Sequence, residues 1–150
     1  MSCAKIRVIH TIPSIEQLAA GPSYSVLRLC EMQFLSDVDI KLCSVGSANE
    51  TPGAAFSKLF SPGLGPKRLG ASSAMQKWLS TAASQGNVDL FHNHSLWMMP
   101  NVYPGMIAKK TGTPMMTSPR GTLSPWAMQS GSVVKKLFWP LLQRRSIQQT

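Results

Sequence analysis

Polar side chains that could bind a ligand gather in two loops of this 150-residue sequence. The first, HNHSLWMMPN, covers residues 92–101, and the second, SPRGTLSPWAM, covers residues 118–128. In the second loop Arg120 lies in a tight Pro-Arg-Gly turn, with donors from Gly121 and Thr122 beside it. A guanidinium binds phosphate or carboxylate through two parallel hydrogen bonds, so Arg120 suits a diphosphate or another anion. A structural arginine that pairs with a neighbouring loop is the alternative.

The first loop offers groups that suit a sugar or a phosphate. We expect Asn93 and His94 to lie at the mouth of the loop, where an imidazole can bind a sugar hydroxyl or a phosphate. We expect His92 to be a hydrogen-bonded histidine packed at the end of a strand. Trp97 could form an apolar shelf for a sugar face, although packing between loop and sheet is the commoner use of such a side chain.

No metal site is predicted. We expect His92 and His94, separated by one residue, to point to opposite sides of an extended strand and not to share an ion. No third ligand of a suitable type stands nearby, since Cys3, Cys30 and Cys43 belong to other segments. An odd number of distant cysteines, two of them in apolar periodic segments, predicts buried free thiols in a reducing cytoplasm.

Alternating strand and helix patterns must position the two loops. Alternation of this kind predicts an α/β fold: a Rossmann-like, open parallel sheet with helices on both faces. Ligands of such sheets bind outside the carboxyl ends of the strands, which is where both loops are expected. The predicted strands are 5–12, 38–45, 88–92 and 114–118. The first predicted helix follows Ser23, which is a candidate cap, and the other three cover residues 75–86, 102–112 and 134–142.

Two segments interrupt this regular pattern. Residues 46–70 are rich in Gly, Ser and Pro and predict a long loop, with one helical turn over 56–60. Pro140 stands within the apolar stripe of the last predicted helix. Because proline lacks an N–H and clashes with the preceding turn, we expect it to kink or split that helix.

The charge balance is strongly basic. Fifteen Lys and Arg residues stand against six Asp and Glu, a formal net charge of +9. Such a surface attracts phosphate, anionic lipid or nucleic acid, with solvated basic faces as the alternative. No nucleic-acid partner is predicted, because no zinc-finger, RNP-like or helix-turn-helix signature accompanies the charge. No apolar run approaches a membrane span or a cleaved signal peptide, so a cytoplasmic location is predicted.

Nearly the whole chain resembles the N-terminal domain of bacterial family 4-type retaining glycosyltransferases, which have the GT-B fold. The specific stretches are DLFHNHSLWMMPNVYPGMIAKKTGTP and SPRGTLSPWAMQSGSVVKKLFW, and weaker likeness covers IRVIHTIPSI, AGPSYSVLRLCE and MQKWL. These stretches are similar to the subgroup that builds capsule, exopolysaccharide and O-antigen chains. The resemblance implies sugar transfer from a nucleotide-sugar to a carbohydrate or lipid-linked acceptor, with retention and without a metal or other cofactor.

The resemblance also implies roles for individual residues. In this family the N-terminal domain shapes the acceptor side, and the C-terminal domain binds the nucleotide-sugar. Gly21 matches one glycine of the loop that approaches the donor diphosphate. The loop after the third strand lines the acceptor cleft, and Arg120-Gly121 matches the turn after the fourth. The expected binding residues are Gly21, Asn93, His94, Ser95, Trp97, Arg120, Gly121 and Thr122.

Three departures from the family pattern limit these expectations. Ala20 replaces the other glycine of the first loop, where a Cβ would hinder close approach of the backbone. Pro119-Arg120 stands where many members have a histidine, so no catalytic residue is assigned. Family members are also much longer, so residues 1–150 are expected to be a truncated N-terminal domain that is inactive by itself.

A non-catalytic role is the alternative function. The basic pairs Lys135-Lys136 and Arg144-Arg145 flank an apolar stripe that contains Phe138 and Trp139. A helix of this composition can lie on anionic lipid. The alternative is therefore a basic domain that binds a membrane surface or a partner. It is compatible with a transferase at the inner membrane face, because lipid-linked acceptors are found there.

Overall fold

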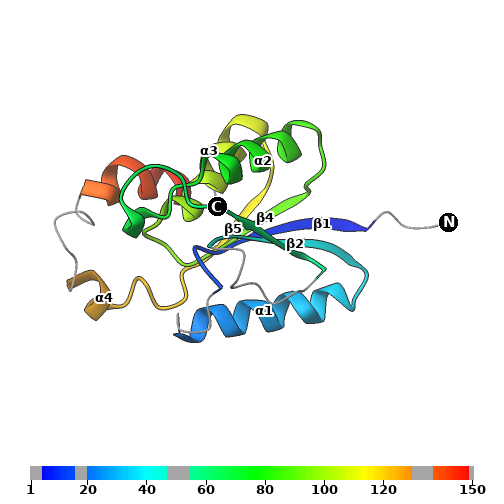
Figure 1. The fold of residues 1–150 in the computed structure, drawn as a ribbon, viewed down its shortest axis with the longest axis horizontal. Coiled ribbons are helices and arrows are strands. Elements are labelled where there is room, and N and C mark those ends of the chain that lie inside the picture. Colours follow the sequence, from blue (N-terminus) through cyan, green and yellow to red (C-terminus); the bar gives the residue numbers. More distant parts are fainter. Residues whose placement is uncertain (1–4, 16–19, 47–54, 130–136, 149–150) are drawn as a thin grey trace.

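A sheet of five parallel strands forms the centre of the fold (Figure 1). The computed structural model describes residues 5–15, 20–46, 55–129 and 137–148. The strands are β1 (Ile6–Thr11), β2 (Val38–Val45), β3 (Ser57–Phe60), β4 (Leu90–His94) and β5 (Met115–Ser118). Their order is β3-β2-β1-β4-β5, so β1 is the middle strand and pairs with both β2 and β4. The predicted α/β fold with an open parallel sheet is confirmed.

Helices cover both faces of the sheet, as Figure 1 shows. On one face, α1 (Ala20–Phe34) packs on apolar side chains of β1 and β2, including Val8 and Ile40. On the other, α2 (Ser73–Ser84) and α3 (Tyr103–Thr111) pack over Ile9 and Phe91. Because side chains alternate along a strand, β1 contributes to both cores, and burial on both sides holds the sheet in place.

Local sequence signals account for the ends of two helices. Ser72 caps the start of α2, where its hydroxyl accepts a hydrogen bond from the N–H of Met75 at 3.3 Å. Gly86 follows the end of α2 with a φ of 67°. Gly112 ends α3 with a φ of 72°, in the left-handed region that favours glycine. The glycines at the two C-terminal ends agree with the predictions made from spacing, whereas α2 begins at Ser73, two residues before its predicted start.

Three local predictions were wrong. Residues 57–60 form β3, which pairs with β2, instead of a helical turn within a loop. Four residues are too few to show a period, so pairing with the edge of β2 decided the outcome. Ser23 lies inside α1, where its hydroxyl donates to the carbonyl of Ser14 at 3.2 Å. A short helix, α4 (Pro125–Gln129), occupies part of the loop predicted after β5.

The predicted state of two cysteines is confirmed. Cys30 and Cys43 are buried and form no disulfide. Burial raises the pKa of the Cys30 thiol to about 12 and raises that of Cys43 still further. Both thiols therefore behave as small apolar core side chains. Cys3 lies outside the described residues.

Pro140 lies within a π-helical turn, η4 (Trp139–Gln143), which continues directly into α6 (Arg144–Ile147). The helix is therefore locally rearranged at Pro140, and the two separate pieces that the sequence predicted as one possibility are not formed. This segment packs closely against the start of α3, where Oγ of Ser146 donates to the carbonyls of Asn101 and Val102 at 3.3 Å. Gly105 permits the approach, because a Cβ there would lie 2.6 Å from the Cα of Ser146. Residues 134–136 of the predicted helix lie outside the described ranges.

Replacement of Gly105 by alanine should therefore force α6 away from α3. We expect Gly105→Ala to lower the free energy of unfolding by about 2 kcal/mol, the typical cost of overpacking a tight contact. Gly21→Ala is the matched control, since Gly21 is helical and a Cβ there meets nothing within 4 Å. It should be neutral or slightly stabilising. Urea unfolding measures both, and equal stabilities would contradict the α3–α6 contact.

Candidate functional site

The candidate site lies where the order of the strands reverses. The chain first moves outward from β1 through β2 to β3, and then returns to the other side of β1 to form β4 and β5. At such a switch point the connections leave the sheet in opposite directions, and ligands of open parallel sheets bind in the resulting crevice. The carboxyl ends of β1 and β4 are side by side there, with His10 opposite His92 and Thr11 opposite Asn93.

Three histidines form a buried cluster at this point. His10 and His94 are 0% exposed, and His92 is 6% exposed. The ring centroids of His92 and His94 are 4.0 Å apart, and the His10 ring lies 5.0 and 5.2 Å from them. The prediction that His92 and His94 point to opposite sides was wrong, because side chains two positions apart in a strand share one face.

Burial keeps the three imidazoles neutral at neutral pH. It is the main cause that lowers the pKa of His10 and of His92 to about 4, and that of His94 to about 2. The positive charge of Arg120 lowers all three values further. The side-chain amide of Gln33 partly opposes this effect and raises the pKa of His10. As predicted, His92 is a hydrogen-bonded histidine at the strand end, with Nε2 2.9 Å from Oγ of Ser118.

A directed chain of hydrogen bonds connects Arg120 to this cluster. Nη2 of Arg120 lies 3.4 Å from Nδ1 of His94, and Nε2 of His94 lies 2.9 Å from Nδ1 of His10. A guanidinium only donates, so Nδ1 of His94 accepts and the single proton of this neutral ring is on Nε2. That proton is donated to Nδ1 of His10, which places the His10 proton on its Nε2.

The turn that carries Arg120 has an uncommon backbone conformation. Arg120 has a φ of 53° and Gly121 a φ of 78°, both in the left-handed region. The Thr122 N–H closes the turn on the carbonyl of Pro119 at 3.1 Å. From this turn, Nη1 of Arg120 reaches Oγ of Ser25 on α1 at 3.4 Å. Its contacts to Ser25 and to His94 are both long, so an anion that binds more closely could displace them.

Asn93 lies on the other face of β4 and is fully buried. Its Oδ1 accepts from Thr11 at 3.1 Å and from Asn101 at 2.9 Å, and its Nδ2 donates to the carbonyl of Ser95 at 3.2 Å. The expectation that Asn93 and His94 lie at the mouth of the loop was therefore wrong, since neither is exposed. Their part in ligand binding stays a prediction.

The loop after β4 is held by contacts with two distant segments. Trp97 has a φ of 77°, uncommon for a bulky side chain, and its N–H donates to Oε1 of Gln143 at 2.9 Å. Its indole Nε1 donates to the carbonyl of Thr122 at 3.2 Å, and its ring lies 5.4 Å from that of Trp139. Trp97 thus joins the two predicted loops by packing. Ser95 also has a positive φ, of 73°.

The remaining predicted residues occupy different positions. The hydroxyl of Thr122 donates to the carbonyl of Pro119 at 2.6 Å, so it is engaged within its own turn. Gly121 is exposed beside Arg120. Gly21 is exposed in the first turn of α1, the helix that also carries Ser25. The structure therefore brings together His94 with Arg120 and Trp97 with Thr122.

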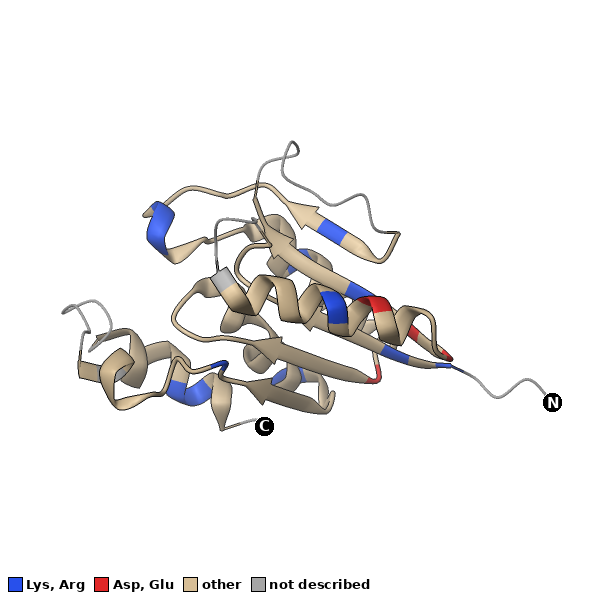
Figure 2. Cartoon of the chain, turned by 90° about the horizontal axis from the view of Figure 1, so that it is seen from below, with Lys and Arg blue, Asp and Glu red and all other residues tan. Residues whose placement is uncertain are grey.

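The described carboxylates lie towards one end of the strands, whereas Lys and Arg occur at both ends (Figure 2). The described carboxylates, on Glu31, Asp37, Asp39 and Asp89, belong to the last turn of α1 or to the amino ends of β2 and β4. None of them lies in the connections at the carboxyl ends, where Arg120 is found. No described carboxylate at this end therefore competes with an anionic ligand for Arg120.

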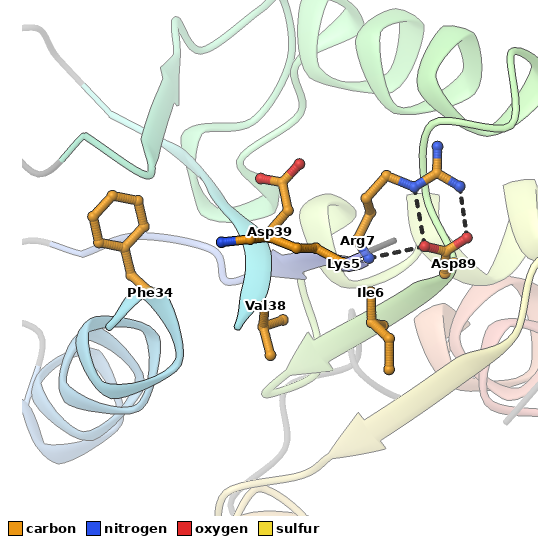
Figure 3. Close-up of a pocket in the computed structure, with 7 residues that line it drawn as sticks. All are labelled: Lys5, Ile6, Arg7, Phe34, Val38, Asp39 and Asp89. Atoms are coloured by element: carbon orange, nitrogen blue, oxygen red, sulfur yellow. Dashed lines mark hydrogen bonds and ion pairs between the residues drawn. The ribbon is translucent and has the colours of Figure 1, made fainter. Parts of the chain in front are cut away.

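An open hollow of about 870 Å³ lies at the amino ends of the strands, opposite the candidate site (Figure 3). The guanidinium of Arg7 donates to both carboxylate oxygens of Asp89, at 2.7 and 3.0 Å, and Phe34 and Val38 form an apolar wall. The pair lowers the pKa of Asp89 to about 2. Because this hollow lies at the amino ends of the strands and Arg7 is already paired with Asp89, we do not assign it a ligand.

Sequence reasoning missed His10 and Ser25. His10 lies in the second half of the first predicted strand, at the same alternation as Val8 and Ile12, and this position could have shown that it faces the α1 side. That His10 lies beside His92 and His94 could not be found without the order of the strands.

One ring nitrogen from each of the three histidines lies within 4.8 Å of the other two, so the cluster could hold a metal ion.

Comparisons with protein-family models, curated proteins and solved structures found no match to this chain. The assignment of the candidate site therefore depends on the geometry of the described residues and on the sequence patterns above.

The buried histidines should make the fold sensitive to mild acid. Unfolded histidines titrate near 6.5, whereas the folded pKa values are about 4 or lower, so the unfolded chain binds protons first. Stability should be complete above pH 6.5 and fall towards pH 4, by up to about 1.4 kcal/mol per pH unit for each histidine. Urea unfolding in metal-free buffer measures this dependence. A free energy of unfolding that is constant between about pH 7 and pH 5 would contradict the assignment of neutral rings.

Proposed function

We propose that this chain is the acceptor-side part of a retaining glycosyltransferase. The reaction is transfer of a sugar from a nucleotide-sugar to a carbohydrate or lipid-linked acceptor. The observation that carries the proposal is Arg120, held in a left-handed turn beside the switch point of a parallel sheet. Phosphate-bearing ligands of such sheets bind in that crevice. The likeness of residues 89–114 and 118–139 to family 4-type transferases supports the same activity.

The charges around the crevice suit the leaving group of such a reaction. Sugar transfer places negative charge on the departing nucleoside diphosphate, and preorganised donors stabilise that charge. Arg120 supplies up to two parallel hydrogen bonds, and the amides at the start of α1 add a positive potential near Gly21. We assign Arg120 to an anionic group of the donor or the acceptor. A further domain of the natural protein would bind the nucleotide, and residues 1–150 alone would not turn over.

Removal of the guanidinium should abolish most of the activity. In the natural full-length protein we expect Arg120→Ala to lower kcat/KM at least about a hundredfold, the loss typical of one preorganised donor. Arg28→Ala is the matched control, because the Arg28 guanidinium pairs with Glu31 in the second half of α1. It should leave turnover unchanged. Release of nucleoside diphosphate from a panel of nucleotide-sugars measures both variants, and wild-type turnover in Arg120→Ala would remove Arg120 from the site.

The length of the natural product tests the proposal independently of any substrate. The 150 residues correspond to 16.3 kDa. A native protein larger by about one domain or more would agree with a separate nucleotide-binding part. An intact mass of 16.3 kDa for the native protein would contradict the proposed catalytic activity.

Exposed apolar side chains near the end of the chain support contact with an anionic membrane as a second function. Leu137 and Leu141 are 59% and 61% exposed, and Arg144 is exposed one turn further on. Insertion of Phe138, expected from the sequence, is contradicted by its burial at 6% exposure. Lys135 and Lys136 lie outside the described residues. None of the described helices has the length and hydropathy needed to cross a bilayer.

Loss of the two exposed leucines should weaken this contact. We expect the double variant Leu137→Ser, Leu141→Ser to bind phosphatidylserine vesicles at least about tenfold more weakly, because each leucine contributes up to about 2 kcal/mol on burial. Leu64→Ser is the control, since Leu64 is fully exposed but lies in the connection before α2. Co-sedimentation at high salt measures the contact. Equal binding of both variants would exclude insertion by Leu137 and Leu141.

A further inference from the structure

Every histidine of this chain belongs to one buried cluster. The sequence contains three histidines, and the fold brings His10, His92 and His94 together from β1 and β4. One ring nitrogen of each lies within 4.8 Å of the other two. Because His10 is more than 80 positions from the other two, only the pairing of β1 with β4 creates the cluster.

We propose that His10, His92 and His94 bind one late first-row divalent cation of the Zn²⁺ class, through one ring nitrogen each. Neutral imidazole is a preferred ligand of Zn²⁺, Cu²⁺ and Ni²⁺, whereas Mg²⁺ and Ca²⁺ require oxygen ligands. The described carboxylates lie towards the opposite edge of the sheet and offer none. Three imidazoles leave one position of a tetrahedral ion open to water or to a ligand. The inference depends on the cluster alone and not on the proposed transferase activity.

Two of the ligand atoms already lie close to the required separation. Nδ1 of His10 and Nε2 of His94 are 2.9 Å apart. Zn–N bonds of about 2.0–2.1 Å in a tetrahedron place two ligand nitrogens about 3.3 Å apart. A cation between these atoms would replace their hydrogen bond and separate them by about 0.4 Å. His92 must move further, because the separations within the cluster extend to 4.8 Å.

Cation binding requires a change at Arg120. When Nε2 of His94 binds a cation, the proton of that ring moves to Nδ1, and no proton is released. Nδ1–H then faces Nη2 of Arg120, now 3.4 Å away, so two donors oppose each other and the guanidinium charge repels the cation. The cation and the Arg120–His94 hydrogen bond therefore exclude one another. Binding of the cation should release Arg120 from His94.

This competition distinguishes the proposed site from unspecific metal binding. Arg120→Gln removes the positive charge and, because its side chain is shorter, also removes the donor that opposes Nδ1–H of His94. Nδ1–H can then donate to water, and an acceptor at that position orients a metal-bound histidine and strengthens its binding. We therefore expect Arg120→Gln to bind the cation about tenfold more tightly or better, whereas His94→Asn should bind it at least about tenfold more weakly.

The test uses the 150-residue chain without a histidine tag, in neutral buffer. Zn²⁺ is titrated by equilibrium dialysis, and Co²⁺ serves as a probe whose absorption reports tetrahedral coordination. The expected result is one ion per chain, with weaker binding by the Asn variants of all three histidines. NMR spectra of the wild-type rings require no variant, since the only histidine signals are those of the cluster. Zn²⁺ should shift the ring signals of all three histidines and move the His94 proton from Nε2 to Nδ1.

Several results would overturn the inference. If the ring signals of the wild-type histidines do not change at saturating Zn²⁺, the inference is wrong. This result holds even if every variant fails to fold. Zn²⁺ binding that the Asn variants leave unchanged would assign the ion to another part of the chain. Unchanged or weaker binding by a folded Arg120→Gln variant would show that Arg120 does not compete with the cation.

Discussion

The parallel register between β1 and β4 is the constraint on which the candidate site depends. It places His10 opposite His92 and Thr11 opposite Asn93. A slip of one residue would turn the β1 side chains to the wrong faces and expose two sets of core residues at once. At the amino ends, Asp89 fixes the same register: its carboxylate accepts from the Arg7 N–H at 2.8 Å, and its own N–H donates to the Arg7 carbonyl at 2.9 Å.

The two faces of β4 then have different roles. On one face, Asn101 donates to Asn93 and to the carbonyl of His94, Asn93 donates to the carbonyl of Ser95, and this network anchors the loop that continues to Trp97. On the α1 face, His10 and His94 form a chain of hydrogen bonds that ends at Arg120, the charged group that contacts the chain among the described residues. The first face thus holds the loop after β4, and the second leaves a guanidinium held by two long contacts.

Nδ1 of His94 is the point at which the proposed activities meet. When Nδ1 of His94 accepts a hydrogen bond from Arg120, the guanidinium is held at the histidines and is less available to an anion at the carboxyl ends of the strands. When the ring instead carries its proton on Nδ1, Arg120 is free to bind phosphate. The separation of charge along the strands serves both cases, because the described carboxylates are too far towards the other edge to neutralise Arg120. A cation in the cluster and an anion at Arg120 would thus favour each other.

The sequence by itself determined the local features of this protein. Alternating patterns predicted the open parallel sheet, Ser72 and Gly112 define helix ends, and Pro140 coincides with a π-helical turn in the last helix, because each signal acts within a few residues. The tertiary structure decided the rest. Residues 57–60 form β3 because they pair with β2. His10 contacts His94, 84 positions away in the sequence, because β1 and β4 are adjacent in the sheet. Strand order and register depend on the free energy of burying whole faces of the sheet. That free energy comes from residues far apart in the sequence, so local spacing does not predict it.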